Sequence, residues 1–123
     1  MKKLLTSLLV CAILCASCYG AAALLGPAKC THYCSKCDTS GVTRSGKKLS
    51  AAYCAADRNY WKPGTKIYFP KLNKTYTIED TGGAVKGKHR FDLCLGNVSK
   101  CKCNNFGVKK LQYKVVYKSN RSW

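Results

Sequence analysis

Acidic residues are scarce in this sequence, which has 22 lysines and arginines, five acids and a formal net charge of +17. Any carboxyl group that serves as a general acid must come from those five, which are Asp38, Asp57, Glu79, Asp80 and Asp92. The excess of positive charge indicates an anionic partner. Nucleic acid is disfavoured, because the basic residues are spread along the chain instead of clustering in an arm or a recognition helix. A basic surface that only keeps the protein soluble is the alternative.

Long apolar runs are also lacking. The longest, residues 4–18, is shorter than the ~20 residues that a membrane-spanning helix needs. It follows Lys2 and Lys3 and precedes the small residues 20–23, an order typical of a cleaved signal peptide. We therefore expect a signal peptide over residues 1–23 and a secreted or periplasmic protein of the cell envelope with no transmembrane segment. Lipid anchoring at Cys18 is less favoured, because the residues before it make a poor lipidation motif.

Cysteine, by contrast, is abundant. Ten are present, three of them inside the expected signal peptide, and the others are Cys30, Cys34, Cys37, Cys54, Cys94, Cys101 and Cys103. In an exported domain of about a hundred residues disulfides compensate for a small core, so we expect a disulfide-stapled domain with one cysteine left over. Zinc is the alternative, because two cysteine pairs have ligand spacing. The sequence has only two histidines and the compartment is oxidising, so we expect no metal, and no cofactor.

Short strand patterns separated by turn residues recur through the rest of the chain. Tyr76 and Ile78, for example, alternate with polar neighbours, as in a half-buried strand. We expect strands over residues 28–38, 49–56, 66–69, 75–79, 91–95 and 111–117, and at most a short helix within residues 97–105. Several short strands in one small domain favour a closed all-β barrel, since closure removes exposed sheet edges. The residues alone do not separate a barrel from a sandwich.

Two of the five acids, Asp80 and Asp92, have sequence neighbours typical of a binding or catalytic site. Asp80 precedes glycines that allow a positive φ and a close approach of a ligand to the backbone. Asp92 lies between Phe91 and Leu93, so it either faces away from the core side chains or is desolvated among them. Desolvation would raise its pKa towards the range of a general acid. The alternatives are a plain β-turn at the glycines and a structural hydrogen-bond acceptor at Asp92.

Six sequence blocks stand out together. They are TRSGK (residues 43–47), AAD (55–57), KPGTK (62–66), DTGGAVKG (80–87), RFDL (90–93) and NFGVKK (105–110). In order and spacing they closely resemble the three-aspartate (3D) domain, which is shared by murein lytic transglycosylase A and bacterial cell-wall proteins. The most specific block is DTGGAVKG. We therefore expect a 3D domain over residues 28–118.

This resemblance implies a double-psi β-barrel of six to seven strands, the architecture also found in family 45 glycoside hydrolases and expansins. It implies that Asp92 protonates the glycosidic oxygen, with Asp80 as its supporting carboxylate, and that Asp57 fixes a loop. The residues expected to bind substrate are Asp57, Thr81, Gly82, Gly83, Lys86 and Trp61. Lys62 departs from the apolar residue usual in the family, and Trp61 beside it belongs either to a sugar-stacking pair with Tyr60 or to the packing of the barrel.

The same resemblance implies a lytic transglycosylase, which cleaves peptidoglycan with the sugar's own C6 hydroxyl as nucleophile. One carboxyl group can then serve first as acid and afterwards as base. An inverting hydrolase would need two carboxyl groups ~6.5–9.5 Å apart. A second hypothesis is a non-catalytic module that binds or loosens the wall through the same groove, because the lytic enzyme carries a second domain that this sequence lacks.

A third hypothesis, an antimicrobial or nucleic-acid-binding protein, leaves DTGGAVKG unexplained. The expected partner is peptidoglycan or another anionic cell-wall polysaccharide, and we expect a monomer that binds no nucleic acid.

Overall fold

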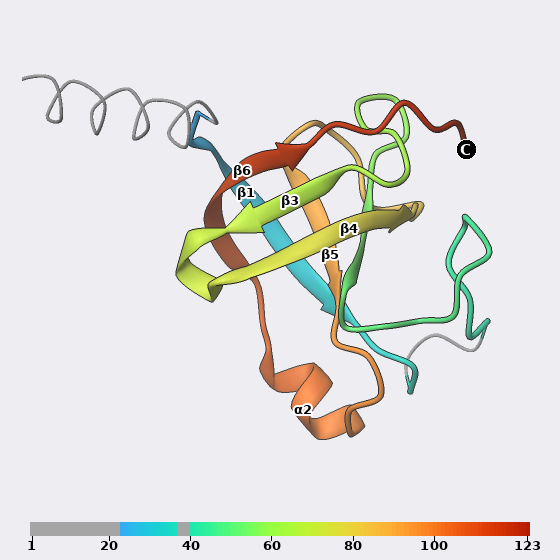
Figure 1. The fold of residues 1–123 in the computed structure, drawn as a ribbon. Helices are drawn as coiled ribbons and strands as arrows, with labels where there is room; N and C mark the ends of the chain where they lie inside the picture. Colours follow the sequence, from blue (N-terminus) through green and yellow to red (C-terminus); the bar gives the residue numbers. More distant parts are fainter. Residues whose placement is uncertain (1–22, 37–39) are drawn as a thin grey trace, which may run out of the picture.

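The computed structural model describes residues 23–36 and 40–123 (Figure 1). Apart from Ala23, the expected signal peptide over residues 1–23 lies outside the described residues, and so do Cys37, Asp38 and Thr39. Within the described part of the chain, no helix is both long enough and apolar enough to cross a membrane.

The described residues form a closed barrel whose six strands follow the order β1-β5-β2-β4-β3-β6 (Figure 1). The strands are β1 (Leu25–Tyr33), β2 (Tyr53–Ala56), β3 (Lys66–Phe69), β4 (Lys74–Asp80), β5 (Arg90–Cys94) and β6 (Lys109–Tyr117). β1 pairs with β5, and β2 with β4, in parallel, whereas the other neighbours are antiparallel. The two parallel pairs separate this barrel from an up-and-down barrel. The expected closed all-β barrel is confirmed, and a sandwich is excluded.

Local sequence accounts for the short connections. A single 3-10 turn, η1 (Pro70–Leu72), joins β3 to β4. Asn73 follows it in the left-handed region (φ 46°), which asparagine tolerates better than most residues. The α-helix of the described residues, α2 (Lys100–Asn105), begins after Ser99, whose hydroxyl accepts a hydrogen bond from the Lys102 N–H. This helix lies beyond the end of β5, outside the barrel wall, as expected for a short helix in this segment (Figure 1).

Alternation along the strands fills the barrel with apolar side chains. On β5, Phe91 and Leu93 are fully buried in the core, so Asp92 between them projects from the outer face of the strand. Phe69 and Tyr113 complete an aromatic centre with Phe91. Ring centroids in this cluster lie 5.1 Å apart for Phe91 and Tyr113, and 5.8 Å apart for Phe69 and Phe91.

The first strand differs from the expected range of residues 28–38, since it begins at Leu25 and ends at Tyr33. The register of β1 against β6 shifts between Leu25 and Ala28. This irregularity accommodates Pro27, which cannot donate to a regular ladder. The strand therefore starts before the proline and not after it.

The second strand is shorter than the expected range of residues 49–56. It comprises Tyr53–Ala56 alone, because the chain turns just before it. In that turn the Tyr53 N–H donates to the Ser50 carbonyl (3.1 Å). The four later strands agree with the expected ranges to within two residues at each end.

Three cysteines do not form the disulfide staples that the sequence predicts. Cys30, Cys54 and Cys94 are buried free thiols on β1, β2 and β5, so the structure does not show the expected staples at these positions. Cys30 and Cys54 pack in the core as small apolar side chains. Burial raises the pKa of the Cys30 thiol to about 12, against a smaller opposite effect of Arg90, and so keeps the thiol neutral. Cys34 and Cys103 are also buried.

Replacing the central ring tests this account of the core. Phe69→Ala should lower the free energy of unfolding by about 3–5 kcal/mol, because it leaves a cavity among aromatic neighbours that cannot collapse fully. Urea denaturation monitored by circular dichroism measures the change. Tyr60→Ala is the matched control, since that ring is 60% exposed, and it should change stability by less than about 0.5 kcal/mol. Equal losses in the two variants would contradict the assignment of Phe69 to the core.

Candidate active site

Two carboxylates lie on the outer face of the barrel at the same level. Asp80 is the last residue of β4 and Asp92 is the middle residue of β5, and each is paired with Ala55 of β2. Paired residues on neighbouring strands point to the same face. Adjacent strands are about 4.8 Å apart, so the Cα atoms of the two acids are separated by roughly 10 Å. The fold therefore brings together the two residues that the sequence singles out as an acid pair.

Asp92 lies in a half-buried and lightly hydrogen-bonded setting. Thr31 on β1 donates its hydroxyl hydrogen to Asp92 Oδ1 (3.0 Å). The Arg90 guanidinium donates in turn to the Thr31 oxygen (2.7 Å). Burial raises the pKa of Asp92 above its ordinary value; the Thr31 hydrogen bond and the charges of Arg90 and His32 oppose this shift without cancelling it, and the nearby negative charge of Asp80 adds to it. A carboxyl group whose pKa is raised in this way is a candidate proton donor.

Asp80 is held much more firmly. Its Oδ1 accepts hydrogen bonds from the backbone N–H groups of Arg44 (2.8 Å) and Thr81 (2.9 Å), and its Oδ2 accepts one from the Tyr33 hydroxyl (3.1 Å). Three donors fix the orientation of this carboxylate. Asp80 is therefore suited to act as a fixed negative charge beside Asp92.

Tyr33 and Thr31 are site residues that the sequence analysis missed. Both lie on β1, and they are 47 and 61 residues away from the acids that they contact, Asp80 and Asp92. Since β5 and β2 separate β1 from β4, the Tyr33 side chain extends over the outer face of these strands. Burial, followed by the charge of Asp80, raises the pKa of Tyr33, so the phenol remains a donor. The only sequence signal for these two residues was the alternation of polar and apolar side chains in the segment that forms β1.

Asp57 fixes the loop that follows β4. Its carboxylate accepts hydrogen bonds from the N–H groups of Gly87 (2.8 Å) and Asn59 (3.0 Å). These two bonds, the one from Gly87 first, lower the pKa of Asp57 against a smaller effect of burial. Gly87 has a φ of 99°, a conformation that disfavours any residue with a Cβ. The carboxylate thus ties the glycine loop to the turn after β2.

A cavity of about 250 Å³ lies between this loop and the turn. It is lined by Arg44, Ala56, Asp57, Arg58, Thr81, Gly82, Gly83, Val85 and Lys86, and we call it the cationic pocket. Five of the six residues expected to bind substrate are among them. Asp80 borders the pocket through its neighbour Thr81. Within residues 23–36 and 40–123, no group of three or more histidine, cysteine or acidic side chains is placed to hold a metal ion.

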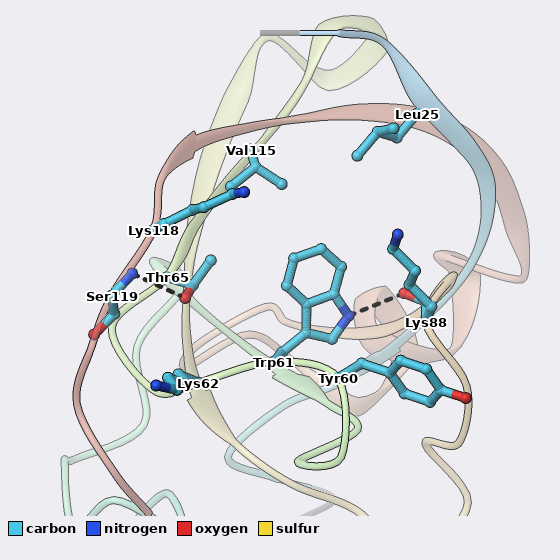
Figure 2. Close-up of a pocket in the computed structure, with 9 residues that line it drawn as sticks. All are labelled: Leu25, Tyr60, Trp61, Lys62, Thr65, Lys88, Val115, Lys118 and Ser119. Atoms are coloured by element: carbon cyan, nitrogen blue, oxygen red, sulfur yellow. Dashed lines mark hydrogen bonds between the residues drawn. The ribbon is translucent and has the colours of Figure 1, made fainter.

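Trp61, the sixth residue expected to bind substrate, lies elsewhere. Its ring is 8% exposed and packs against Phe91 and Tyr113, with centroids 5.6 and 6.1 Å away. Its exposed edge lines a second cavity, which Figure 2 shows. Tyr60 is largely exposed, so the two neighbouring rings do not form one stacking platform.

Glu79 connects the C-terminal tail to the loop that holds Asp80. Its buried carboxylate forms a bidentate ion pair with Arg121 (2.7 and 3.2 Å) and accepts a hydrogen bond from the Ser45 hydroxyl (2.6 Å). Burial acts to raise the pKa of Glu79, but the hydrogen bonds and charge of its partners outweigh it and lower the pKa. The Ser45 N–H also donates to the Glu79 carbonyl (3.1 Å). This network fixes the segment from which Arg44 reaches Asp80.

The fold and the site together define a small closed β-barrel with an acid pair on its outer face beside a cationic pocket. A family model described as "3D domain" matches residues 52–117, more than half of the chain, and the chain belongs to this family. The family is associated with proteins that act on cell-wall glycans. No curated protein matches the chain. Thr31 and Tyr33 precede the matched segment and Arg121 follows it.

The Glu79 ion pair should support the fold in a pH-dependent way. Arg121→Gln leaves a buried carboxylate without its main partner, so the free energy of unfolding at pH 7 should fall by about 1–3 kcal/mol. The lowered pKa means that the folded protein keeps Glu79 charged where the unfolded chain would protonate it. The stabilisation is therefore complete above pH 4.5, the ordinary value, and is lost as pH falls through the lowered one.

Urea denaturation at pH 7 and pH 3 measures this difference. The exposed Lys118→Gln, in the same tail and with the same charge change, is the control and should have little effect at either pH. A loss for Arg121→Gln that is equal at both values would refute the ion-pair account.

The raised pKa of Asp92 predicts a pH dependence of stability opposite to that of Glu79. The folded protein binds the proton of Asp92 more tightly than the unfolded chain, so this residue lowers stability as pH rises from 3.8 through its raised pKa. Asp92→Asn removes that titration, and its amide oxygen can still accept the Thr31 hydrogen bond. We expect the variant to be at least as stable as the parent at pH 7 and to lose this advantage at pH 3, in thermal unfolding scans. A variant clearly less stable at pH 7 would show that the carboxylate is structural.

Proposed function

We propose that this 3D-domain protein is exported and cleaves the glycosidic bonds of peptidoglycan as a lytic transglycosylase, with Asp92 as general acid and base in a barrel of the double-psi type. The observation that carries the proposal is the setting of Asp92. Burial raises its pKa, it stands opposite the same β2 residue as Asp80, and the cationic pocket begins next to that pair.

One carboxyl group accounts for both proton transfers. Asp92 gives its proton to the glycosidic oxygen as the bond from that oxygen to the anomeric carbon breaks. The resulting carboxylate takes the proton of the sugar's C6 hydroxyl, whose oxygen forms the new bond to the anomeric carbon. Asp92 is thereby protonated again, and the product is a 1,6-anhydro sugar. No water molecule is consumed in this reaction.

Asp80 supports the reaction by its charge. A fixed carboxylate near the anomeric carbon stabilises the positive charge that develops there. An inverting hydrolase would instead need a second carboxylate to activate water. The three donors on the Asp80 oxygens argue against that role, because they fix the carboxylate and fill three of its roughly four acceptor sites. Tyr33 acts here as a positioning residue.

The cationic pocket suits an anionic wall polymer. Arg44, Arg58 and Lys86 are exposed around the glycine loop, and the one acid that lines the pocket, Asp57, is engaged with backbone N–H groups. The same lining favours a second candidate function, a non-catalytic module that binds or loosens the wall. In that case the cations would hold the polymer and Asp92 would have no chemical role.

Digestion of purified sacculi separates these functions. We expect the parent protein to release 1,6-anhydromuropeptides, detected by mass spectrometry, and Asp92→Asn to lower their release at least about a hundredfold, since general acid–base catalysis contributes that much. The stability measurement on the same variant controls for folding. Sedimentation with sacculi should be unchanged in Asp92→Asn, because the charges of the cationic pocket remain.

Each other outcome points to a different conclusion. Reducing ends in place of anhydro sugars would indicate hydrolysis. Retained release in Asp92→Asn would exclude this residue as the acid. Sedimentation that weakens at high salt, without any released product from the parent protein, would support the binding module.

A further inference from the structure

A second cavity, of about 360 Å³, is lined by residues of the turn that follows Asp57, among them Tyr60 and Trp61 (Figure 2). We call it the tryptophan pocket. Its lining residues are Leu25, Tyr60, Trp61, Lys62, Thr65, Lys88, Val115, Lys118 and Ser119. The N–H groups of Tyr60 and Trp61 both donate to the Asp57 carbonyl (3.0 Å each), so one tight turn separates this cavity from the cationic pocket. The two cavities share no lining residue.

The floor of the tryptophan pocket is rigid. The Trp61 indole N–H donates to the Lys88 carbonyl (2.9 Å), and the ring packs on the aromatic core. The C-terminal tail is also attached here, since the Trp123 indole N–H donates to the Trp61 carbonyl (3.0 Å) and the Ser119 N–H donates to Thr65 Oγ1 (3.3 Å). Because these hydrogen bonds and ring contacts already restrain the floor, it loses little conformational entropy when a ligand binds.

The rim is cationic and carries one open aromatic ring. The exposed lysines Lys62, Lys88 and Lys118 surround the Trp61 edge in Figure 2, and none of the nine lining residues is acidic. Tyr60 is 60% exposed and packs against no other ring of the described residues. An exposed ring beside three uncompensated cations matches a ligand that has a flat apolar face and carries a negative charge.

We infer that the tryptophan pocket is a second glycan-binding site, which takes a pyranose bearing an oxyanion. The apolar face of the sugar ring stacks on the exposed Tyr60 ring beside the Trp61 edge, and the lysines bind the oxyanion. The identity of the polymer rests on the proposed function, but binding here does not depend on catalysis at Asp92. A glycan strand bound in both this pocket and the cationic pocket would cross the turn after Asp57.

Intrinsic fluorescence is a direct readout of this site. The chain has two tryptophans, Trp61 and Trp123, and they contact each other at the pocket. The Asp92→Asn protein is titrated, so that no turnover occurs, with three probes. These are the carboxylate-bearing disaccharide N-acetylglucosaminyl-N-acetylmuramic acid, N-acetylglucosamine 6-phosphate, and neutral chitobiose. We expect saturable changes with at least one charged probe and binding about tenfold weaker or more for chitobiose, as the loss of several ion pairs would give.

The two charged probes distinguish the source of the oxyanion. Preference for the disaccharide assigns the site to the carboxylate of muramic acid, and preference for the sugar phosphate assigns it to a phosphate-bearing wall polymer. No saturable change with either charged probe, or equal affinity for chitobiose, would overturn the inference.

Variants locate the binding on the molecule. Lys62→Gln, Lys88→Gln and Lys118→Gln together should weaken binding of the preferred charged probe about tenfold, whereas the same charge change at the exposed residues Lys48, Lys102 and Lys110 should not. Tyr60→Ala should weaken it and Tyr60→Phe should restore it, because the phenylalanine keeps the stacking face.

Disabling the other pocket separates this inference from the proposed function. Binding should persist in the double variant Arg58→Gln and Lys86→Gln, which removes two charges from the cationic pocket. Loss of binding in that variant, with no effect of the three substitutions around Trp61, would place the site in the cationic pocket and overturn the inference. Release of anhydromuropeptides by the parent protein would stand in either case.

Discussion

The candidate site depends on the position of β2 between β4 and β5, with Ala55 opposite both Asp80 and Asp92. The parallel pairing of β1 with β5 then places Thr31 opposite Asp92. A shift of one residue in the register of β5 against β1 or β2 would turn Asp92 into the aromatic core, because side chains alternate between the two faces of a strand. Closure of the barrel holds these registers, since each strand is paired on both sides.

The environment of each carboxylate separates the acids into distinct roles. Asp57 and Glu79 have lowered pKa values because backbone N–H groups, or Arg121 and Ser45, hold their charged forms. Asp80 is fixed by three donors. Asp92 combines a single side-chain donor, Thr31, with burial that raises its pKa. This difference between neighbouring carboxyl groups supports the roles proposed for Asp92 as the acid and Asp80 as its electrostatic support.

Some of the abundant positive charge of the chain gathers around two cavities. The turn after Asp57 separates two cavities, each lined by three cations, and that aspartate is the one acid among all the residues that line them. One cavity adjoins the acid pair, and the other has an aromatic floor anchored by the C-terminal tail. Long-range attraction at these cavities therefore favours anionic ligands over neutral ones.

The sequence by itself determined the all-β class, the approximate position of most strands and the family, and it singled out Asp80 and Asp92, because alternation and a specific motif such as DTGGAVKG are local properties of the chain. It did not determine the start of β1, the free state of Cys30, Cys54 and Cys94, or the separation of Trp61 from the other residues expected to bind substrate. Only the tertiary structure brought Thr31 and Tyr33 to the acids. These contacts depend on which strands are neighbours and in what register, and pairing across 47 or 61 residues leaves no local trace in the chain.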